Sequence, residues 1–153
     1  MPDTFSQIDI HLVFAVKNRQ TLILQGFREQ LFKYITGIIT NKEQKLLAIN
    51  GTSDHIHIFF GMKPSIYIPE FVKVIKVEST NFINDSKFLR TKFQWQQGYG
   101  VFAHSKSNRD NVIKYILNQE IHHRKQSFKD EFILFLKKMD IEFDKKFLFD
   151  FFE

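Results

Sequence analysis

Apolar residues recur along this chain at two different spacings, and the spacings predict its secondary structure. Strict alternation with polar residues is typical of a half-buried strand, whereas recurrence every three or four residues is typical of an amphipathic helix. Segments with strand character are residues 7–16, 45–49, 53–60, 93–95 and 99–104. Segments with helical character are residues 27–40, 70–84, 108–123 and 128–138.

Turn-forming and helix-starting residues lie between these segments. Residues 50–54, Asn-Gly-Thr-Ser-Asp, predict a turn into the third strand, and Pro69 stands where the second helix would begin. Ser107 is expected to cap the third helix, with Asp110 three residues later as an acidic near-capping box. Ser127 is expected to cap the last helix in the same way.

The order of the elements indicates the fold class. Helices that alternate with hairpins predict an α+β sandwich, with a mainly antiparallel sheet and helices packed on it. No repeat, low-complexity tract or linker interrupts the chain, so residues 1–153 are expected to form a single domain. The aromatic segment at residues 147–152 is too apolar to remain in solvent, and we expect it to pack on its own core or on a second subunit.

Composition narrows the class of protein. The chain has 153 residues, 43% of them hydrophobic and 19 of them Phe, which is typical of a globular protein. The lack of cysteine excludes disulfide scaffolds, cysteine zinc sites and thiol nucleophiles. No signal peptide and no apolar run of about 18 residues is evident, so we expect a cytoplasmic protein that does not engage a membrane. The net charge of +5 is a modest bias toward polyanionic partners.

His55 and His57 lie one residue apart in the strand at 53–60. Side chains alternate between the faces of a strand, so both imidazoles share one face while Ile56 and Ile58 share the other. Two imidazoles on a rigid strand could form half of a metal site, since histidine is the commonest metal ligand. They could equally be two polar residues on the open face of a half-buried sheet.

A second group of polar residues lies on the predicted helix at 108–123. At about 100° per residue, Tyr115, Gln119 and His122 share one stripe of this helix. The adjoining arc, which is expected to face the core, holds the apolar residues Val112, Ile113, Ile116 and Leu117. Taken alone, a Tyr and a Gln at this spacing are more typical of a boundary tyrosine beside a solvated glutamine.

Together the two groups indicate a metal-dependent reaction. A metal ion held by His55, His57 and the amide oxygen of Gln119 would keep positions open for a substrate oxygen. Mixed nitrogen and oxygen ligands without sulfur favour Mg²⁺ or Mn²⁺, with Zn²⁺ as an alternative. Beside such an ion, Tyr115 could attack a DNA phosphodiester to form a phosphotyrosine and free a 3′-hydroxyl, so that rejoining needs no ATP.

Three segments carry a resemblance to a known family. They are HIH at residues 55–57, WQQGYGVF at residues 95–102, and VIKYILNQ at residues 112–119, the last followed by two histidines. In order and separation they resemble the IS200/IS605-type single-tyrosine (Y1) transposases of the HUH superfamily, the IS200-like transposases. The resemblance extends over nearly the full length of the chain.

The resemblance implies a ferredoxin-like or RRM-like fold and a homodimer, in which the tyrosine helix of one subunit can complete the site of the other. It implies that His55, His57 and Gln119 bind the metal and that Tyr115 is the nucleophile. The implied substrate is single-stranded DNA, cut near hairpins at the ends of a mobile element that moves as a circular single-stranded intermediate. Residues 118–125 also resemble members associated with repetitive palindromes, which are often single-copy and not mobile.

His104 departs from the family pattern, which leads us to expect a small or hydrophobic residue at this position. A neutral surface change is the favoured interpretation, because histidine is commonly exposed or lies at a boundary. A DNA contact and an extra group near the metal are the alternatives.

Basic residues near loops and helix starts are candidate phosphate contacts. Each of them could also be a solvated surface charge. Those singled out are Lys17, Arg19, Lys73, Lys76 and Arg109. Trp95 could stack on an unpaired base, but its apolar neighbours favour a core position. The other tyrosines are expected to be structural or peripheral: Tyr34, Tyr67 and Tyr99.

Three other functions compete with a transposase. The chain could be a non-catalytic protein that binds DNA hairpins, a domesticated repeat-associated endonuclease of the HUH type, or a metal-dependent hydrolase in which Tyr115 only positions water. The presence of all four inferred site residues, His55, His57, Tyr115 and Gln119, argues against the loss of catalysis.

Overall fold

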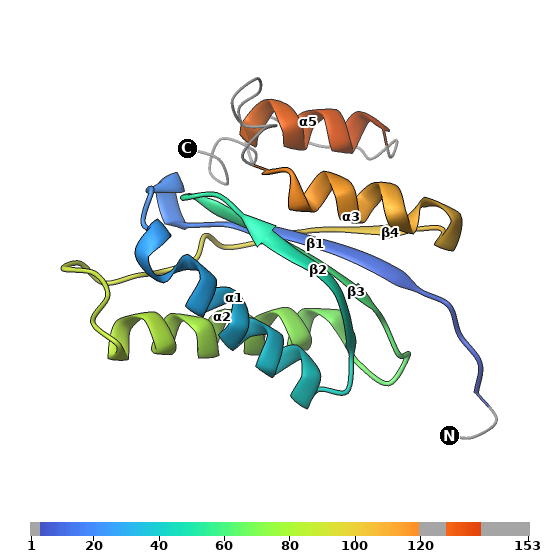
Figure 1. Ribbon diagram of the computed structural model, residues 1–153, viewed down its shortest axis with the longest axis horizontal. Coiled ribbons are helices and arrows are strands. Elements are labelled where there is room, and N and C mark those ends of the chain that lie inside the picture. The colour runs from blue at the N-terminus through green and yellow to red at the C-terminus, as the bar shows by residue number, and fades with distance from the viewer. Residues whose placement is uncertain (1–3, 120–127, 139–153) are drawn as a thin grey trace.

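The computed structural model describes residues 4–119 and 128–138 (Figure 1). The strands are β1 (Asp9–Ala15), β2 (Lys45–Gly51), β3 (His55–Gly61) and β4 (Gly100–His104). The helices are α1 (Gln25–Asn41), α2 (Ile68–Asp85), α3 (Arg109–Leu117) and α5 (Phe128–Lys138), with short 3₁₀ turns at Lys17–Arg19 and Lys106–Asn108. No helix within the described ranges is long and apolar enough to cross a lipid bilayer.

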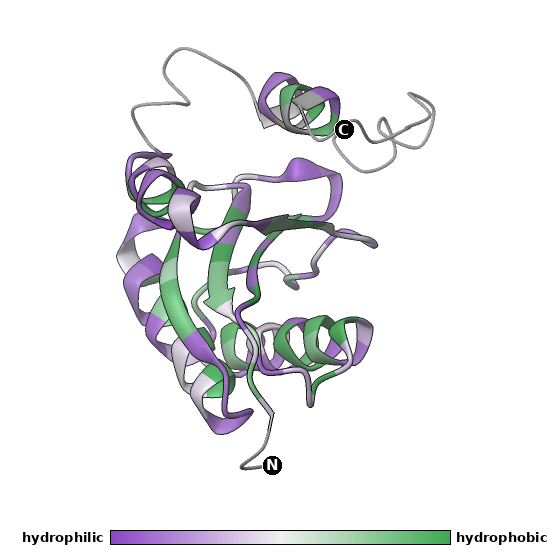
Figure 2. Cartoon of the chain, turned by 90° about the vertical axis from the view of Figure 1, so that its right-hand side faces the viewer, coloured by the Kyte–Doolittle hydropathy of each residue, from purple (hydrophilic) through white to green (hydrophobic). Residues whose placement is uncertain are grey.

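The four strands form one antiparallel sheet in the order β2-β3-β1-β4. The helices α1 and α2 cover one face of the sheet, while α3 lies against the other face with α5 beyond it (Figure 1). Figure 2 shows the same layers from the side, with hydrophobic residues concentrated in the strands. The predicted α+β architecture with a mainly antiparallel sheet is confirmed.

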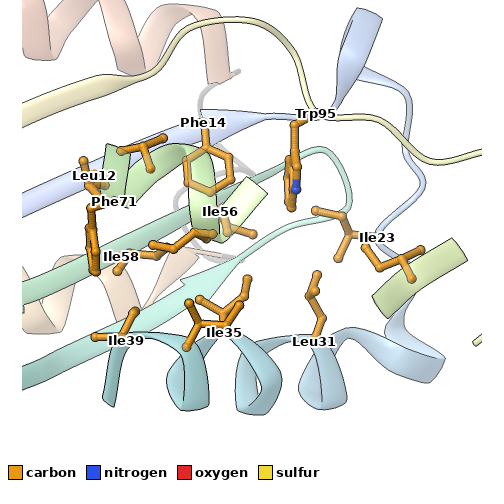
Figure 3. Close-up of a cluster of buried hydrophobic side chains, with 14 of the residues drawn as sticks. Leu12, Phe14, Ile23, Leu31, Ile35, Ile39, Ile56, Ile58, Phe71 and Trp95 are labelled. Carbon is orange, nitrogen blue, oxygen red and sulfur yellow. The ribbon is translucent and has the colours of Figure 1, made fainter. Parts of the chain in front are cut away.

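The core lies between the sheet and the layer formed by α1 and α2 (Figure 3). On this side β3 contributes Ile56, Ile58 and Phe60, and β1 contributes Leu12 and Phe14, all of them fully buried. The helices contribute Leu31, Ile35, Ile39, Phe71 and Ile75. Burial of each such large apolar side chain stabilises the fold by about 1.5–3 kcal/mol. This packing determines which face of β3 is turned away from α1 and α2.

The turn between β2 and β3 requires a glycine at position 51. A Cβ atom added to Gly51 would meet the backbone oxygen of His55 and would lie 2.9 Å from the Cα of Ile56. Without a side chain, the two strands can approach closely, and the turn is completed by Thr52 to Asp54. As a result, His55 begins β3 directly beside the polar side chains of this turn.

The start of α3 differs from the prediction. Ser107 does not cap the helix, because it lies inside the 3₁₀ turn at Lys106–Asn108, and its Oγ lies 3.0 Å from Ser105 Oγ. Asn108 takes the N-cap position without a capping bond from its side chain. The 3₁₀ turn therefore moves the first residue of the helix to Arg109.

The predicted strand at 93–95 is reduced to one isolated bridge between Val16 and Trp95. The backbone of Phe93 pairs instead with the side chain of Asn84 in α2. Phe93 N donates to Asn84 Oδ1 at 2.8 Å, and Asn84 Nδ2 donates to the carbonyl of Phe93 at 3.3 Å. A side-chain amide has thus replaced a strand partner for this residue.

The helix α3 ends at Leu117, whereas the spacing predicts a helix that continues further. Asn118 leaves the helical conformation, with φ −101° and ψ 26°. Asn50 Nδ2 donates to the last carbonyls of the helix, at 3.0 Å to Ile116 and 3.1 Å to Leu117. Leu117, the last residue of the helix, is 57% exposed, and the prediction that it faces the core is wrong.

The last helix, α5, has the predicted bounds, Phe128–Lys138. Other predictions lie outside the described residues: His122 on the tyrosine stripe, the Ser127 cap and the aromatic segment at 147–152.

Candidate active site

The face of β3 that turns away from α1 and α2 carries two buried imidazoles. His55 is 0% exposed and His57 is 1% exposed, and their ring centroids lie 5.1 Å apart. The two histidines share a face as predicted, with Ile56 and Ile58 in the core on the opposite side. Buried ring nitrogens need partners within the protein, and those partners decide where each imidazole points.

The turn before β3 orients His55. Its Nδ1 lies 2.7 Å from Asp54 Oδ1 and 3.0 Å from Thr52 Oγ1, and Thr52 Oγ1 donates to Asp54 Oδ1 at 3.0 Å. Burial alone would raise the pKa of the Asp54 carboxyl, but hydrogen bonds from His55 and Thr52 and the charges of His55 and Arg19 lower it below its ordinary value. A carboxylate can only accept, so Nδ1 of His55 carries the proton and Nε2 is left facing the site.

A third histidine, His11 of β1, orients His57. His11 Nε2 lies 2.8 Å from His57 Nδ1, and the two rings are stacked with centroids 5.0 Å apart. His11 is 0% exposed, and burial, followed by the nearby His57 and His104, lowers its pKa well below the ordinary value. This bond uses Nδ1 of His57, and the other ring nitrogen, Nε2, faces the site.

The two Nε2 atoms face oxygen atoms from two later segments. His55 Nε2 lies 3.3 Å from Gln119 Oε1, and His57 Nε2 lies 3.1 Å from Glu131 Oε1 of α5. Gln119 is 0% exposed and Glu131 is 3% exposed, so the site is closed to bulk solvent on this side. Ligand atoms of His55, His57 and Glu131 all lie within 4.8 Å of one another.

The position of α3 follows from a small apolar contact with the sheet. Val112 and Ile116 of α3 pack on Ala48 of β2 and Phe59 of β3, with Tyr115 partly buried at the edge of the cluster. The helix thus lies on the sheet of its own chain. Although the helix ends before Gln119, Gln119 Nε2 donates to the backbone oxygen of Tyr115 at 3.4 Å, and the two side chains are also hydrogen-bonded to each other.

Tyr115 lies at the edge of the imidazole pair. Its ring centroid is 6.0 Å from that of His57, with the ring planes nearly perpendicular. Burial raises the pKa of the Tyr115 hydroxyl well above its ordinary value, and the negative charge of Glu131 and a hydrogen bond to Glu131 raise it further, against a smaller lowering by Gln119. The hydroxyl is therefore protonated at neutral pH.

The donor set fits a hard divalent cation. Two imidazole nitrogens, an amide oxygen and a carboxylate oxygen are ligand types that Mg²⁺ and Mn²⁺ accept, and no sulfur is present. Two ligands at right angles around an ion, with bonds of about 2.1 Å, are about 3 Å apart. The separations of 3.3 Å from His55 to Gln119 and 3.1 Å from His57 to Glu131 are close to that value.

Sequence reasoning missed His11 and Glu131. His11 alternates with buried Ile10 and Leu12, so its place on the imidazole face of the sheet could have been inferred from the strand pattern. Glu131 carries no comparable local signal, because acidic residues in the first turn of a helix are ordinary.

The structure places His104 differently from the expected surface change. It is half-buried, its ring centroid lies 5.9 Å from those of both His11 and Phe59, and its Nδ1 lies 3.3 Å from Asn108 Nδ2. His104 thus extends the row of imidazoles on this face of the sheet toward β4.

Two of the predicted phosphate contacts, Arg109 and Lys76, each make two hydrogen bonds within the protein. Arg109 donates to both carboxylate oxygens of the buried Asp9, at 2.8 and 3.0 Å. Lys76 donates to the carbonyls of Gln96 and Gly98 at 2.8 and 2.7 Å, and burial lowers its pKa to about 8. These bonds orient both side chains, and DNA contact by either remains a prediction.

The other predicted phosphate contacts lie in different surroundings. Lys17 donates to Gln94 Oε1 at 3.2 Å and, with Lys76, lines a pocket of about 550 Å³ between α2 and residues 94–98. Arg19 lies close enough to Asp54 to lower its pKa, whereas Lys73 is exposed on α2. The basic residues therefore do not form one cluster, and their contacts with DNA remain predictions.

The remaining large aromatics are structural. Trp95 is 8% exposed, packs edge-on against Phe14 and donates from Nε1 to Ser79 Oγ at 2.9 Å, which confirms its core position. Tyr34 stacks on Phe82 with centroids 4.2 Å apart. The two other tyrosines are peripheral to the imidazoles: Tyr99, partly buried against the main core, and Tyr67, which is 73% exposed.

Comparison with known proteins identifies relatives of the chain. The model of the family described as "Transposase IS200 like" matches residues 4–119. That range contains His55, His57, Tyr115 and Gln119 and ends before α5. The ISDra2 transposase TnpA of Deinococcus radiodurans is 25% identical over 119 residues, which cover 74% of this chain and 84% of the relative.

Two solved structures share the fold. A structure described as a transposase of Deinococcus radiodurans superimposes with a TM-score of 0.63 at 25% identity, covering 76% of this chain and 94% of that one. A REP-associated tyrosine transposase bound to a REP hairpin superimposes with a TM-score of 0.61 at 15% identity, covering 78% of this chain and 71% of that one.

Proposed function

This chain belongs to the IS200-like transposase family, and from that premise we propose that it cleaves and rejoins single-stranded DNA through Tyr115. The observation that carries the proposal is the convergence of His55 Nε2, His57 Nε2 and Gln119 Oε1 beside the Tyr115 ring. A nucleophile next to a set of metal ligands is the arrangement that attack on a phosphodiester requires.

The residues of the site would have two roles, metal binding and nucleophilic attack. His55, His57 and Gln119 would hold Mg²⁺ or Mn²⁺, which when bound polarises a phosphate oxygen and shields its charge. The Tyr115 hydroxyl attacks phosphorus, the bond from phosphorus to the tyrosine oxygen forms, and the bond to the 3′-oxygen breaks to release a 3′-hydroxyl. Because burial and Glu131 raise the pKa of Tyr115, its proton must leave as the new bond forms, and the departing 3′-oxygen takes up one proton, so no net proton is released.

The resulting 5′-phosphotyrosine would conserve the energy of the broken bond. A second 3′-hydroxyl can attack this phosphorus, restore a phosphodiester and return the proton to Tyr115, so rejoining needs no ATP. We propose hairpin-bearing DNA ends as the substrate, by analogy with the REP-associated tyrosine transposase that shares the fold and is bound to a REP hairpin.

A denaturing gel tests the proposal. The protein is incubated with Mn²⁺ and hairpin-bearing single-stranded DNA, and a covalent adduct is expected that disappears in Tyr115→Phe. Tyr34→Phe is the matched control, since Tyr34 stacks on Phe82 in another part of the molecule, and it should keep the adduct. Cleavage without an adduct would instead indicate a hydrolase, and bound but intact DNA would indicate a non-catalytic hairpin-binding protein.

We also propose that the protein works as a homodimer. The helix α3 lies on β2 and β3 of its own chain, so Tyr115 reaches His57 without a partner in this arrangement. Light scattering at micromolar concentration, run in parallel with the adduct assay, tests the assembly. A monomer with full activity would contradict a requirement for two subunits.

A further inference from the structure

We propose that Glu131, on α5, is a fourth protein ligand of the divalent metal ion. The match to the family model ends at residue 119, whereas α5 covers Phe128–Lys138, so this ligand would come from outside the matched domain. The inference rests on the proposed function, because it takes His55, His57 and Gln119 to be the other ligands.

The first argument is the contact between His57 and Glu131. In the tautomer in which Nδ1 of His57 donates to His11 Nε2, 2.8 Å away, the lone pair of His57 Nε2 points into the site, as metal binding requires. That lone pair lies 3.1 Å from a carboxylate oxygen of Glu131, which is also an acceptor. Two acceptors at this distance repel each other unless a proton or a cation lies between them.

The contact between His55 and Gln119 also brings a ring nitrogen close to an oxygen that can only accept a hydrogen bond. Nδ1 of His55 donates to Asp54, so its Nε2 lone pair faces the amide oxygen of Gln119 at 3.3 Å. Ligand atoms of His55, His57 and Glu131 all lie within 4.8 Å of one another, so a single ion can contact all three residues. One divalent cation among the four atoms would relieve both contacts.

The charge of Glu131 supports the same assignment. Two neutral imidazoles and an amide leave the charge of a bound divalent cation uncompensated, and affinity at such sites rises with the charge of the ligands. Glu131 is 3% exposed and lies beside His57, so its carboxylate is placed to supply this compensating negative charge. An ion bound in this way would also hold α5 against the sheet.

Mn²⁺ binding to the full chain without DNA tests the assignment, with free Mn²⁺ followed by electron paramagnetic resonance. Glu131→Gln keeps the size of the side chain and removes its charge, and it should weaken Mn²⁺ binding about ten- to a hundredfold. Asp130→Asn is the matched control, because Asp130 is an exposed neighbour on the same helix and loses the same charge. Its affinity should equal that of the unmodified protein.

Circular dichroism of each variant checks that it folds. If Glu131→Gln does not fold, Glu131→Asp replaces it, since a carboxylate shortened by one methylene should bind Mn²⁺ more weakly than Glu131. Unchanged or tighter Mn²⁺ binding by the folded variant would overturn the assignment. Glu131 would then shield the histidines from solvent without binding the metal ion.

His57→Ala separates the two proposals. If the unmodified protein binds Mn²⁺, His57→Ala abolishes binding and Glu131→Gln has no effect, only the role of Glu131 fails. If the unmodified protein binds no Mn²⁺, the metal site of the proposed function and the role of Glu131 fail together.

Discussion

The strand β3 presents two buried faces with opposite chemistry. Toward α1 and α2 it places Ile56, Ile58 and Phe60, and toward α3 it places His55 and His57, which are just as inaccessible to solvent. The apolar face is stabilised by contact area, which has no preferred direction. The imidazole face depends on hydrogen bonds in which each nitrogen must meet a matching donor or acceptor.

This difference predicts how each face responds to substitution. On the apolar face, volume decides the outcome, and a side chain of similar size should preserve most of the stability. On the imidazole face, a ring of similar size without nitrogens should preserve the fold yet lose the orientation of its neighbour. Substitutions on the first face should therefore change stability, and substitutions on the second should change metal binding.

The largest effect on stability is expected for Phe60→Ala. Phe60 is 0% exposed and its ring lies 5.0 Å from that of Phe71, so the truncation leaves a cavity and should cost about 3–5 kcal/mol. Urea denaturation measures the loss, and Phe60→Leu should cost less. The Mn²⁺ affinity of the folded fraction should not change. A large fall in that affinity would contradict the independence of the two faces.

An intermediate effect is expected for His11→Phe, on the other face. The aromatic volume is kept, but His57 Nδ1 loses its hydrogen-bond partner at 2.8 Å, so His57 is no longer held in place. Mn²⁺ affinity should fall about ten- to a hundredfold, as for other residues that orient a metal ligand. His11→Gln, which restores an acceptor oxygen, should recover part of the affinity. Equal affinities in all three proteins would show that His11 does not position His57.

The smallest effect on stability is expected for Lys76, a charged residue beside the apolar core. The Nζ of Lys76 lies 5.3 Å from the centroid of the Phe14 ring. Burial lowers the pKa of Lys76 to about 8 from 10.5, so the unfolded chain binds more protons than the folded chain between these values. The free energy of unfolding should consequently rise as the pH increases from 8 toward 10.5, by about 1 kcal/mol because solvent screens part of the effect.

Lys76→Met tests the contribution of Lys76. Urea denaturation at pH 7.5 and 9.5 should show a smaller rise in stability for this variant than for the unmodified protein. The control is Lys73→Met, since Lys73 is exposed on the same helix and its removal should leave the rise unchanged. Identical pH dependence in all three proteins would contradict a buried ammonium at position 76.

Local patterns in the sequence were sufficient for much of this architecture. Alternation in β3 placed His55 and His57 on one face, and helical spacing placed Tyr115 one turn from Gln119, because both periodicities follow from backbone geometry alone. The same reasoning did not predict where α3 ends, because a side chain distant in the sequence binds the last carbonyls of this helix. The helix α3 ends early beside Asn50 of β2, which donates to its last carbonyls.

What the sequence by itself determined is therefore most of the elements, the two faces of β3, and the family of the chain. Gln119 was also inferred from the sequence as a partner of His55 and His57. Only the tertiary structure decided the other partners of the imidazoles: His11, 46 residues before His57, and Glu131 on α5. Contacts over such separations form when whole elements pack through their apolar surfaces. The residues that meet at their edges are a consequence of that packing and have no signature in the local spacing.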